Sequence, residues 1–182
     1  ELDELALLDV LRAPYLTTGP RVDQFERQLA SLTGATEAVV VNSGTAALHT
    51  AVHVAGIGPG DEVIVPALTF AASANAVLYC GGTVRFADVD PGTLTVSPAS
   101  VRAQITERTR AIVAVDYAGQ PCDYDAIDAI ALEHGLTVIA DACHSLGASY
   151  HGAPVGTLAA LSAFSFHPVK PITTAEGGAI TT

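Results

Sequence analysis

The chain has 182 residues, of which 49% are hydrophobic and 15% are charged, and its formal net charge is −11 at pH 7. This length suits one domain with a sizeable buried core. The negative charge argues against a nucleic-acid backbone as the main partner, but it does not exclude a phosphorylated small molecule, because a helix N-terminus binds phosphate locally.

Other simple features narrow the class of protein further. No apolar run reaches the length of a membrane span, and no signal peptide is visible. Three cysteines are an odd number and lack the spacing of a disulfide framework or a metal site. We therefore expect a cytoplasmic protein with reduced cysteines and no membrane partner.

Apolar residues with helical spacing open the chain, at 1–12 and 23–33. Beyond them, short β-branched runs alternate with helical stretches. The runs predict seven strands, at 38–42, 62–66, 83–88, 111–117, 137–141, 162–166 and 178–182. The helical stretches between them lie at 45–55, 71–80, 98–105 and 124–134.

Strands that alternate with helices predict an α/β fold with a mostly parallel sheet. Several of these strands are apolar on both faces, which indicates helices on both sides of the sheet. We expect a helical segment at 1–36 and a large domain at 37–182, in a chain that looks cut at both ends. Functional groups in such a sheet should gather past the carboxyl ends of its strands.

Lys170 is the single lysine of the chain, whereas the other seven basic residues are arginines. An arginine guanidinium stays protonated, but a lysine amine can lose its proton and attack a carbonyl. A chain that dispenses with lysine elsewhere and keeps one is expected to use its amine. The alternative is a solvated lysine in a chain whose composition favours arginine, and the count alone does not decide between the two.

Two further segments place polar groups at predicted strand ends. The run 42–48 follows the first strand and opens a helix, where Gly44, Thr45 and neighbouring hydroxyls could hold an anion. Taken alone, this run is more typical of an ordinary helix cap. Asp141 ends a buried strand, where its carboxylate needs a cation or several donors, although it could also cap the next helix. A protonated pyridine nitrogen would be such a cation.

Other candidates are weaker singly. His144 lies three residues after Asp141, Phe70 could stack on a flat ring, and Ser165 could donate to a phosphate. A structural histidine, a core phenylalanine and an ordinary serine are the default interpretations of these residues. His49 and His53 have the spacing of a metal pair, but no third ligand is apparent, so we expect no metal site.

Together, these signals place an anion cradle, a buried acid, an aromatic ring and the only lysine at one edge of the sheet. Pyridoxal phosphate needs this set: an anchor for its phosphate, an acid for its ring nitrogen, support for its ring face and an amine for a Schiff base.

Several motifs, in the same order, resemble the DegT-type aminotransferases of nucleotide-linked keto sugars, which are fold-type I pyridoxal-phosphate enzymes. The resemblance covers essentially the whole chain. Its motifs lie at 18–26, 42–48, 58–64, 141–148 and 164–178. Within the family, the segments 115–121 and 170–178 look closest to the transaminase of the pseudaminic-acid pathway, which acts on C4 of a UDP-linked 4-keto-6-deoxy N-acetylhexosamine.

The resemblance assigns a role to each candidate residue. Lys170 matches the Schiff-base lysine, Asp141 the partner of the pyridine nitrogen, and His144 the residue that approaches the ring hydroxyl or ring face. The remaining matches are a stacking aromatic, Phe70, and three phosphate contacts, Gly44, Thr45 and Ser165.

The family also implies features beyond these residues. Relatives use glutamate as the amino donor, form homodimers in which the second subunit completes the phosphate site, and continue into a smaller C-terminal domain that this chain lacks. Three alternatives stay open: a sugar dehydratase of the same fold, a non-catalytic or regulatory protein, and a nucleotide-binding α/β module. Dehydratases of this type carry histidine in place of the lysine, so Lys170 argues against the first.

Overall fold

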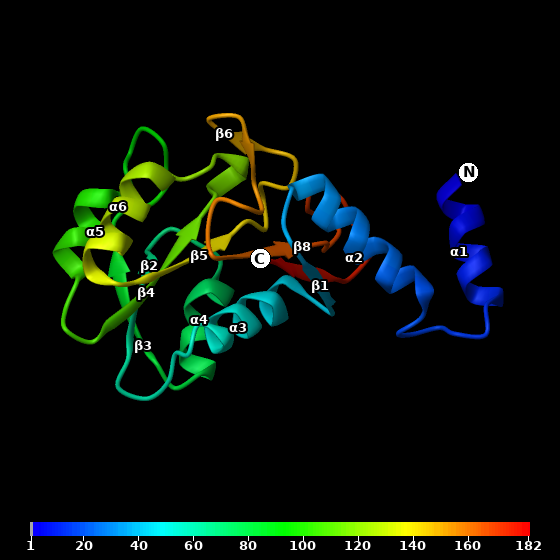
Figure 1. Ribbon diagram of the computed structural model, residues 1–182, viewed down its shortest axis with the longest axis horizontal. Coiled ribbons are helices and arrows are strands. Elements are labelled where there is room, and N and C mark those ends of the chain that lie inside the picture. Colours follow the sequence, from blue (N-terminus) through cyan, green and yellow to red (C-terminus); the bar gives the residue numbers. More distant parts are fainter. Residues whose placement is uncertain (1) are drawn as a thin grey trace.

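Seven strands form one sheet in the order β1-β9-β8-β5-β4-β2-β3 (Figure 1). The structure is a computed structural model that describes residues 2–182. The strands of this sheet are β1 (Ala38–Val41), β2 (Glu62–Pro66), β3 (Thr83–Ala87), β4 (Thr109–Val115), β5 (Thr137–Asp141), β8 (Leu161–Ser165) and β9 (Gly178–Thr181). A separate hairpin, which was not predicted from sequence, pairs β6 (Ser149–Tyr150) with β7 (Ala153–Pro154).

Helices connect most of these strands. They are α1 (Leu2–Arg12), α2 (Pro20–Thr33), α3 (Gly44–Val54), α4 (Ala71–Tyr79), α5 (Pro98–Gln104), α6 (Tyr124–His134) and the 3-10 turn η1 (Tyr117–Gly119). Local sequence explains several of their ends. Ser43 and Asp123 cap α3 and α6 through their side chains, and Gly34 and Gly135 end α2 and α6 in the left-handed conformation that glycine favours.

The prediction of a mostly parallel seven-stranded sheet is confirmed, with one detail that the sequence did not show. Strands β3, β2, β4, β5 and β8 run parallel. Strand β9 lies between β8 and β1 and is antiparallel to both. The predicted boundaries shift by a few residues; for example, α2 starts at Pro20 instead of residue 23, and β4 spans 109–115 instead of 111–117.

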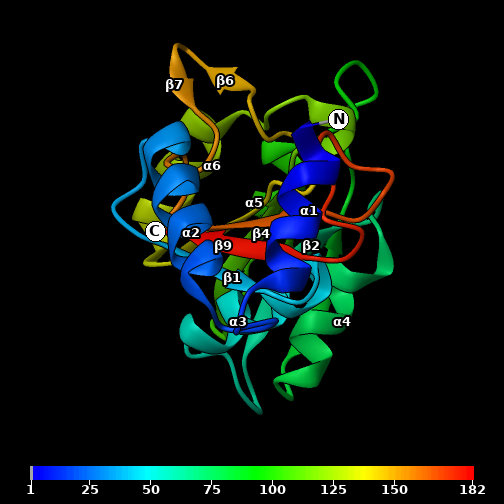
Figure 2. The same ribbon diagram turned by 90° about the vertical axis from the view of Figure 1, so that its right-hand side faces the viewer.

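The helices cover the two faces of the sheet in separate groups (Figures 1 and 2). On one face, α3 and α4 pack on side chains such as Val63, Val113 and Ile139. On the other face, α5 and α6 pack on Ile64, Ile112 and their neighbours, and α2 packs there on Phe164. Each fully buried isoleucine or valine of this kind contributes about 1.5–3 kcal/mol of stability. Helices on both faces were predicted.

The strand register determines which way the last residues of β4 and β5 point. Asp141 pairs with Val115 and Ala163, which both face α3 and α4, so its carboxylate points toward those helices. Asp116 follows Val115 directly, so it points to the opposite face, toward α6. The sheet thus ends in two buried acids that face in opposite directions.

The N-terminal helix α1 stands beside the body of the fold (Figure 1). None of its described residues is buried, and its leucines are exposed. Among residues 2–182, no helix is both long and apolar enough to cross a membrane.

Candidate active site

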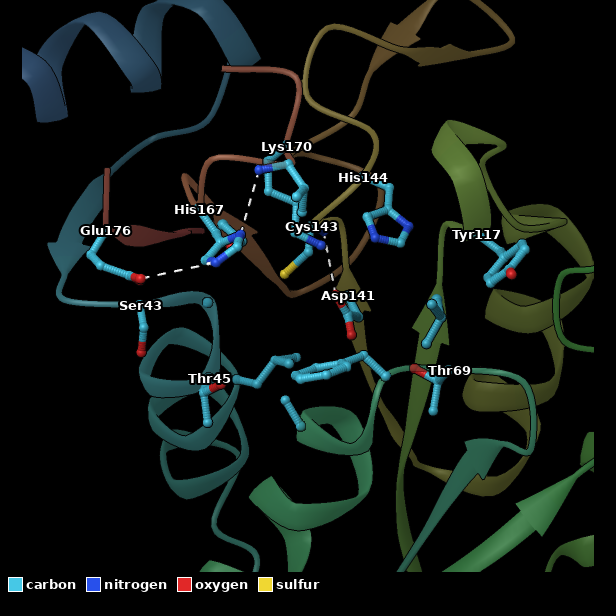
Figure 3. Close-up of a pocket in the computed structure, with 17 residues that line it drawn as sticks. Ser43, Thr45, Thr69, Tyr117, Asp141, Cys143, His144, His167, Lys170 and Glu176 are labelled. Carbon is cyan, nitrogen blue, oxygen red and sulfur yellow. Dashed lines mark hydrogen bonds and ion pairs between the residues drawn. The ribbon is translucent and has the colours of Figure 1, made fainter. Parts of the chain in front are cut away.

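A cavity of about 350 Å³ opens at the carboxyl ends of the parallel strands (Figure 3). It is lined by residues from the N-termini of α3 and α4, the ends of β4, β5 and β8, and the loop between β8 and β9. All seven predicted site residues line it: Gly44, Thr45, Phe70, Asp141, His144, Ser165 and Lys170. The structure therefore brings together residues that lie up to 126 positions apart in the chain.

One end of the cavity is the N-terminus of α3. Ser43 caps this helix: its hydroxyl accepts from the N–H of Ala46 and its carbonyl from Ala47. The N–H groups of Gly44 and Thr45 come first in the helix, where no backbone partner exists, and the first turn carries no acidic residue. Free N–H groups and the helix dipole at this end favour an anion.

Gly44 lies close against the end of β8. A Cβ atom at this position would come within 2.7 Å of the Ser165 Cβ and 3.1 Å of the Cys143 sulfur. Only glycine allows the helix to approach this closely, and the approach places the hydroxyl of Ser165 beside the helix N-terminus. Within residues 2–182, neither Ser165 nor Thr45 has a hydrogen-bond partner for its hydroxyl, so both can donate to a bound anion.

Asp141 forms the floor of the cavity and is only 6% exposed. Its Oδ2 accepts a 2.7 Å hydrogen bond from the Ser73 hydroxyl, and its Oδ1 accepts from the Cys143 N–H at 3.3 Å. The hydroxyls of Ser73 and Thr69 lie 2.6 Å apart, which extends the network to the loop before α4. Among the described residues, Asp141 has no cationic partner within 4 Å, so this buried carboxylate can pair with a cation from a ligand.

Lys170 lies in the loop between β8 and β9, on the opposite side of the cavity from the floor (Figure 3). Its backbone N–H donates to the carbonyl of His167 at 2.9 Å, which holds the loop in a turn. In the part of the chain that the structure describes, its side-chain amine forms no ion pair. The amine is therefore available for chemistry in the cavity.

His144 lies between Lys170 and Tyr117, above Asp141 (Figure 3). Its Nδ1 accepts a 3.3 Å hydrogen bond from the backbone N–H of Ala118, and its ring meets that of Tyr117 edge to face at 6.3 Å. Burial lowers the pKa of His144 below its ordinary value, and the positive charge of Lys170 lowers it further, while Asp141 partly opposes the shift. At neutral pH the imidazole is therefore uncharged.

Phe70 borders the open side of the cavity. It precedes α4 and is 74% exposed, although it is a large apolar side chain. Core packing, the default interpretation of a phenylalanine, is therefore excluded for this residue. A flat ligand above Asp141 would cover an aromatic face that is otherwise in water.

Several residues in and behind the cavity were not predicted from sequence. Ser73 does not line the cavity but reaches Asp141 from α4, and its spacing from Phe70 gave no chemical signal. His167 and Glu176 lie at the mouth, 4.0 Å apart between Nε2 and Oε1 (Figure 3). Cys143 lines the wall, and burial raises the pKa of its thiol, with a further contribution from Asp141, so the thiol stays protonated.

His49 and His53 do not share a site with further ligands in the described structure. Between residues 2 and 182, no group of three or more His, Cys, Asp or Glu side chains could hold a metal ion. His49 instead packs edge to face against Tyr79, with ring centroids 5.4 Å apart.

The chain matches known proteins along its whole length. Residues 1–182 match the model of the DegT/DnrJ/EryC1/StrS aminotransferase family. The chain is 46% identical over 174 residues to the spore coat polysaccharide biosynthesis protein SpsC of Bacillus subtilis. The aligned region covers 96% of this chain and 45% of SpsC. The chain is 48% identical over 166 residues to the GDP-perosamine synthase of Caulobacter vibrioides, with 91% of this chain and 45% of that protein covered.

Solved structures agree with this match. The PseC aminotransferase of Helicobacter pylori, involved in the biosynthesis of pseudoaminic acid, superposes with a TM-score of 0.95 at 38% identity, over 100% of this chain and 49% of PseC. The PLP-form of the putative sugar aminotransferase Spr1654 from Streptococcus pneumoniae gives a TM-score of 0.93 at 37% identity, over 96% and 48% of the two chains. The chain thus spans about half the length of these relatives. It belongs to the DegT/DnrJ/EryC1/StrS aminotransferase family.

Proposed function

We propose that the protein is a pyridoxal-phosphate-dependent aminotransferase that moves an amino group from glutamate to C4 of a nucleotide-linked 4-keto-6-deoxy sugar. The observation that supports this proposal most strongly is that Lys170 and Asp141 line the same cavity. The only lysine of the chain lies there with an unpaired amine, across from a buried carboxylate that lacks a cation among the described residues.

The residues of the cavity fit the parts of this cofactor. The first N–H groups of α3 and the hydroxyls of Thr45 and Ser165 suit the phosphate. Asp141 suits the protonated ring nitrogen, because its carboxylate is buried with only neutral donors around it. Phe70 is exposed at the cavity and can cover a ring face, and His144 adds an uncharged imidazole to the lining.

When bound, the cofactor supplies an electron sink for the carbanion that forms when an amino acid loses its Cα proton. Lys170 would hold the cofactor through its amine, which an amino donor would release for proton transfer. The freed Nζ would be the base that takes the Cα proton of the donor and passes it to the cofactor, and in the return half-reaction it would carry a proton from the cofactor to C4 of the sugar. Asp141 would keep the ring nitrogen protonated, because a carboxylate and a neighbouring cation favour each other's charged forms.

The names of the relatives support the substrate class. One is a GDP-perosamine synthase, whose name gives a nucleotide-linked product, and another is an aminotransferase of pseudoaminic acid biosynthesis. We therefore propose a nucleotide sugar as the acceptor, with the UDP-linked 4-keto-6-deoxy N-acetylhexosamine as the first compound to try. Glutamate as donor rests on the family resemblance.

We further propose that the protein works as a homodimer. The anion end of the cavity has no arginine among its lining residues, so the helix N-terminus and hydroxyls are left to hold a doubly charged phosphate. Phe70 on the open side is 74% exposed. A second subunit against this side would cover Phe70 and could bring the missing cation.

All residues that line the cavity lie between 43 and 176, which supports the assignment of 37–182 as the cofactor domain, with 1–36 as a preceding helical segment.

A two-step assay tests the proposed function. The protein is loaded with pyridoxal phosphate and given glutamate, and 2-oxoglutarate is quantified. Excess glutamate is then removed, the keto sugar is added, and the amino sugar is detected by mass spectrometry. We expect both products in a one-to-one ratio. Formation of 2-oxoglutarate without transfer to any nucleotide-linked keto sugar would refute the proposed acceptor, and release of a dehydrated sugar would indicate a dehydratase.

A further inference from the structure

A second buried carboxylate lies beside the site, and the proposed mechanism does not use it. Asp116 follows β4, is fully buried, and points to the face opposite Asp141. It accepts three hydrogen bonds: Oδ1 from the Cys122 N–H and from the Tyr124 hydroxyl, both at 3.0 Å, and Oδ2 from the Ser145 hydroxyl at 2.7 Å. Hydrogen bonds to both carboxylate oxygens thus hold this buried side chain in one orientation.

These bonds join the segments that follow two neighbouring strands. The backbone N–H of Asp116 donates to the carbonyl of Asp141 at 3.1 Å, and its side chain accepts from Ser145. Ser145 is the residue after His144, and its own N–H donates to the carbonyl of Ala142 at 3.1 Å. The turn that carries His144 is therefore tied to Asp116 from the side away from the cavity.

The turn after Asp116 is strained, and it contacts His144 directly. Ala118 has φ of 53° and ψ of 24°, a left-handed conformation that costs a residue with a Cβ atom about 1 kcal/mol or more. Gly119 follows with φ of 89°, and a Cβ atom there would lie 3.2 Å from the His144 carbonyl. This conformation aims the Ala118 N–H at Nδ1 of His144, at 3.3 Å. Strain of this kind persists only where the surroundings hold it.

The Ala118 contact determines where His144 carries its proton. A backbone N–H can only donate, so Nδ1 must be the bare nitrogen of the ring. In a neutral imidazole the proton then lies on Nε2. His144 lines the cavity above Asp141 (Figure 3), so this tautomer offers an N–H donor from the cavity wall.

We propose that Asp116 is a positioning residue: by tying the turn 116–119 to the turn that carries His144, it keeps His144 in the single tautomer that is protonated on Nε2. The hydrogen-bond geometry of the chain alone supports this inference. Its use in transamination, as a fixed donor to an oxygen of the bound cofactor or substrate, rests on the proposed function.

The test reads the tautomer directly and needs no cofactor. Long-range ¹⁵N–¹H NMR spectra of the uniformly labelled protein distinguish protonated from bare ring nitrogens, and His144→Gln assigns the His144 signals. In the unaltered protein we expect Nδ1 to resonate as a bare nitrogen and Nε2 as a protonated one. Ser145→Ala removes the 2.7 Å bond to Oδ2 of Asp116, together with a longer 3.4 Å bond from the same hydroxyl to the Ala142 carbonyl within the turn. We expect the two shifts to move toward the averaged values of a free histidine.

The matched control is Ser162→Ala, which removes a buried hydroxyl on β8 that has no hydrogen-bond partner among residues 2–182. We expect it to leave the His144 shifts unchanged. If Ser145→Ala does not fold, Tyr124→Phe removes another donor to Asp116 and should move the shifts in the same direction. Wild-type shifts in the folded Ser145→Ala or Tyr124→Phe protein would overturn the inference. Since no cofactor is present, that result would leave the aminotransferase proposal untouched.

Discussion

Ser73 and Asp141 are 68 residues apart in sequence, yet the Ser73 hydroxyl donates a 2.7 Å hydrogen bond to Oδ2 of Asp141. The bond links α4 to the end of β5 below the floor of the cavity. Both residues are buried, and the Ser73 hydroxyl also lies 2.6 Å from that of Thr69. The acid at the centre of the proposed mechanism is thus oriented by a helix that otherwise contributes to the core.

Ser73→Ala should therefore affect both the fold and the site. The change removes a hydrogen bond to a charged group, and among the described residues no other donor to Oδ2 of the buried Asp141 remains. We expect the free energy of unfolding to fall by about 1.5–3 kcal/mol, and the affinity for pyridoxal phosphate to fall as well. Urea unfolding and a cofactor titration measure the two effects.

Ser162→Ala is the matched comparison for Ser73→Ala. Ser162 is also fully buried, but its hydroxyl has no hydrogen-bond partner in the described structure. Removal of an unsatisfied buried hydroxyl should leave stability unchanged or raise it by about 1 kcal/mol. Equal losses in the two variants would contradict the role that we assign to the Ser73–Asp141 bond.

Gly44→Ala tests the close approach of α3 to β8. The added methyl group would lie 2.7 Å from the Ser165 Cβ, so the helix or the strand must move. We expect a destabilisation of about 1–3 kcal/mol, together with weaker binding of pyridoxal phosphate because the anion site loses its geometry. Gly58→Ala is the control, since a Cβ atom at Gly58 meets nothing within 4 Å. A Gly44→Ala protein that binds the cofactor as well as Gly58→Ala does would exclude the α3 N-terminus as the phosphate site.

Asp141→Asn should separate cofactor binding from catalysis. The amide is close in size to the carboxylate and can still accept from Ser73, so part of the cofactor affinity should remain. It cannot keep a ring nitrogen protonated, and we expect the rate of transamination to fall by about 10²–10³-fold. Single-turnover kinetics with glutamate measure this rate. A fall of less than about threefold would show that Asp141 does not face the ring nitrogen.

The contribution of Asp116 to stability should depend on pH. Burial raises its pKa above the ordinary value of 3.8, the hydrogen bond from Ser145 opposes the rise, and the negative charge of Asp141 adds to it. As pH rises from about 3.8, the unfolded chain ionises at this residue before the folded protein does, so the contribution of Asp116 to stability declines until its folded pKa is passed.

Asp116→Asn cannot ionise, so it isolates this contribution. The free energy of unfolding of the wild type minus that of Asp116→Asn should be largest at acidic pH and fall toward neutral pH. Urea unfolding of both proteins between pH 3.5 and 7, where each stays folded, gives this difference. A difference that increases with pH would mean that the hydrogen bonds to Asp116 lower its pKa more than burial raises it.

The fold was predictable from sequence because its strands are short apolar runs with helices between them. The buried runs at 62–66 and 137–141 were predicted with the bounds that the structure shows. The direction of β9 was not predictable in this way, because an apolar strand has the same composition whether it runs parallel or antiparallel. The two-residue strands β6 and β7 were missed because so short a segment carries no periodic pattern.

In the candidate site as well, residues with a local sequence signal were predicted and residues without one were missed. Lys170 and Asp141 were identified because a single lysine and an acid at the end of a buried strand are visible in the sequence itself. Ser73 and Asp116 act through contacts with residues that are distant in sequence, Ser73 at a separation of 68 positions and Asp116 with Ser145 at 29. No local pattern distinguishes such a serine from its neighbours, and Asp116 was overlooked although it follows a buried strand much as Asp141 ends one.

The proposed function depends on Lys170 as the residue that binds pyridoxal phosphate, and chemical labelling tests this role. The protein is incubated with pyridoxal phosphate, reduced with borohydride and digested, and the peptides are mapped by mass spectrometry. Since Lys170 is the only lysine, the N-terminal amine is its only competitor. We expect a reduced pyridoxyl group on Lys170, and none at residue 170 in Lys170→Arg. A folded protein that carries the label at its N-terminus alone would contradict this role of Lys170.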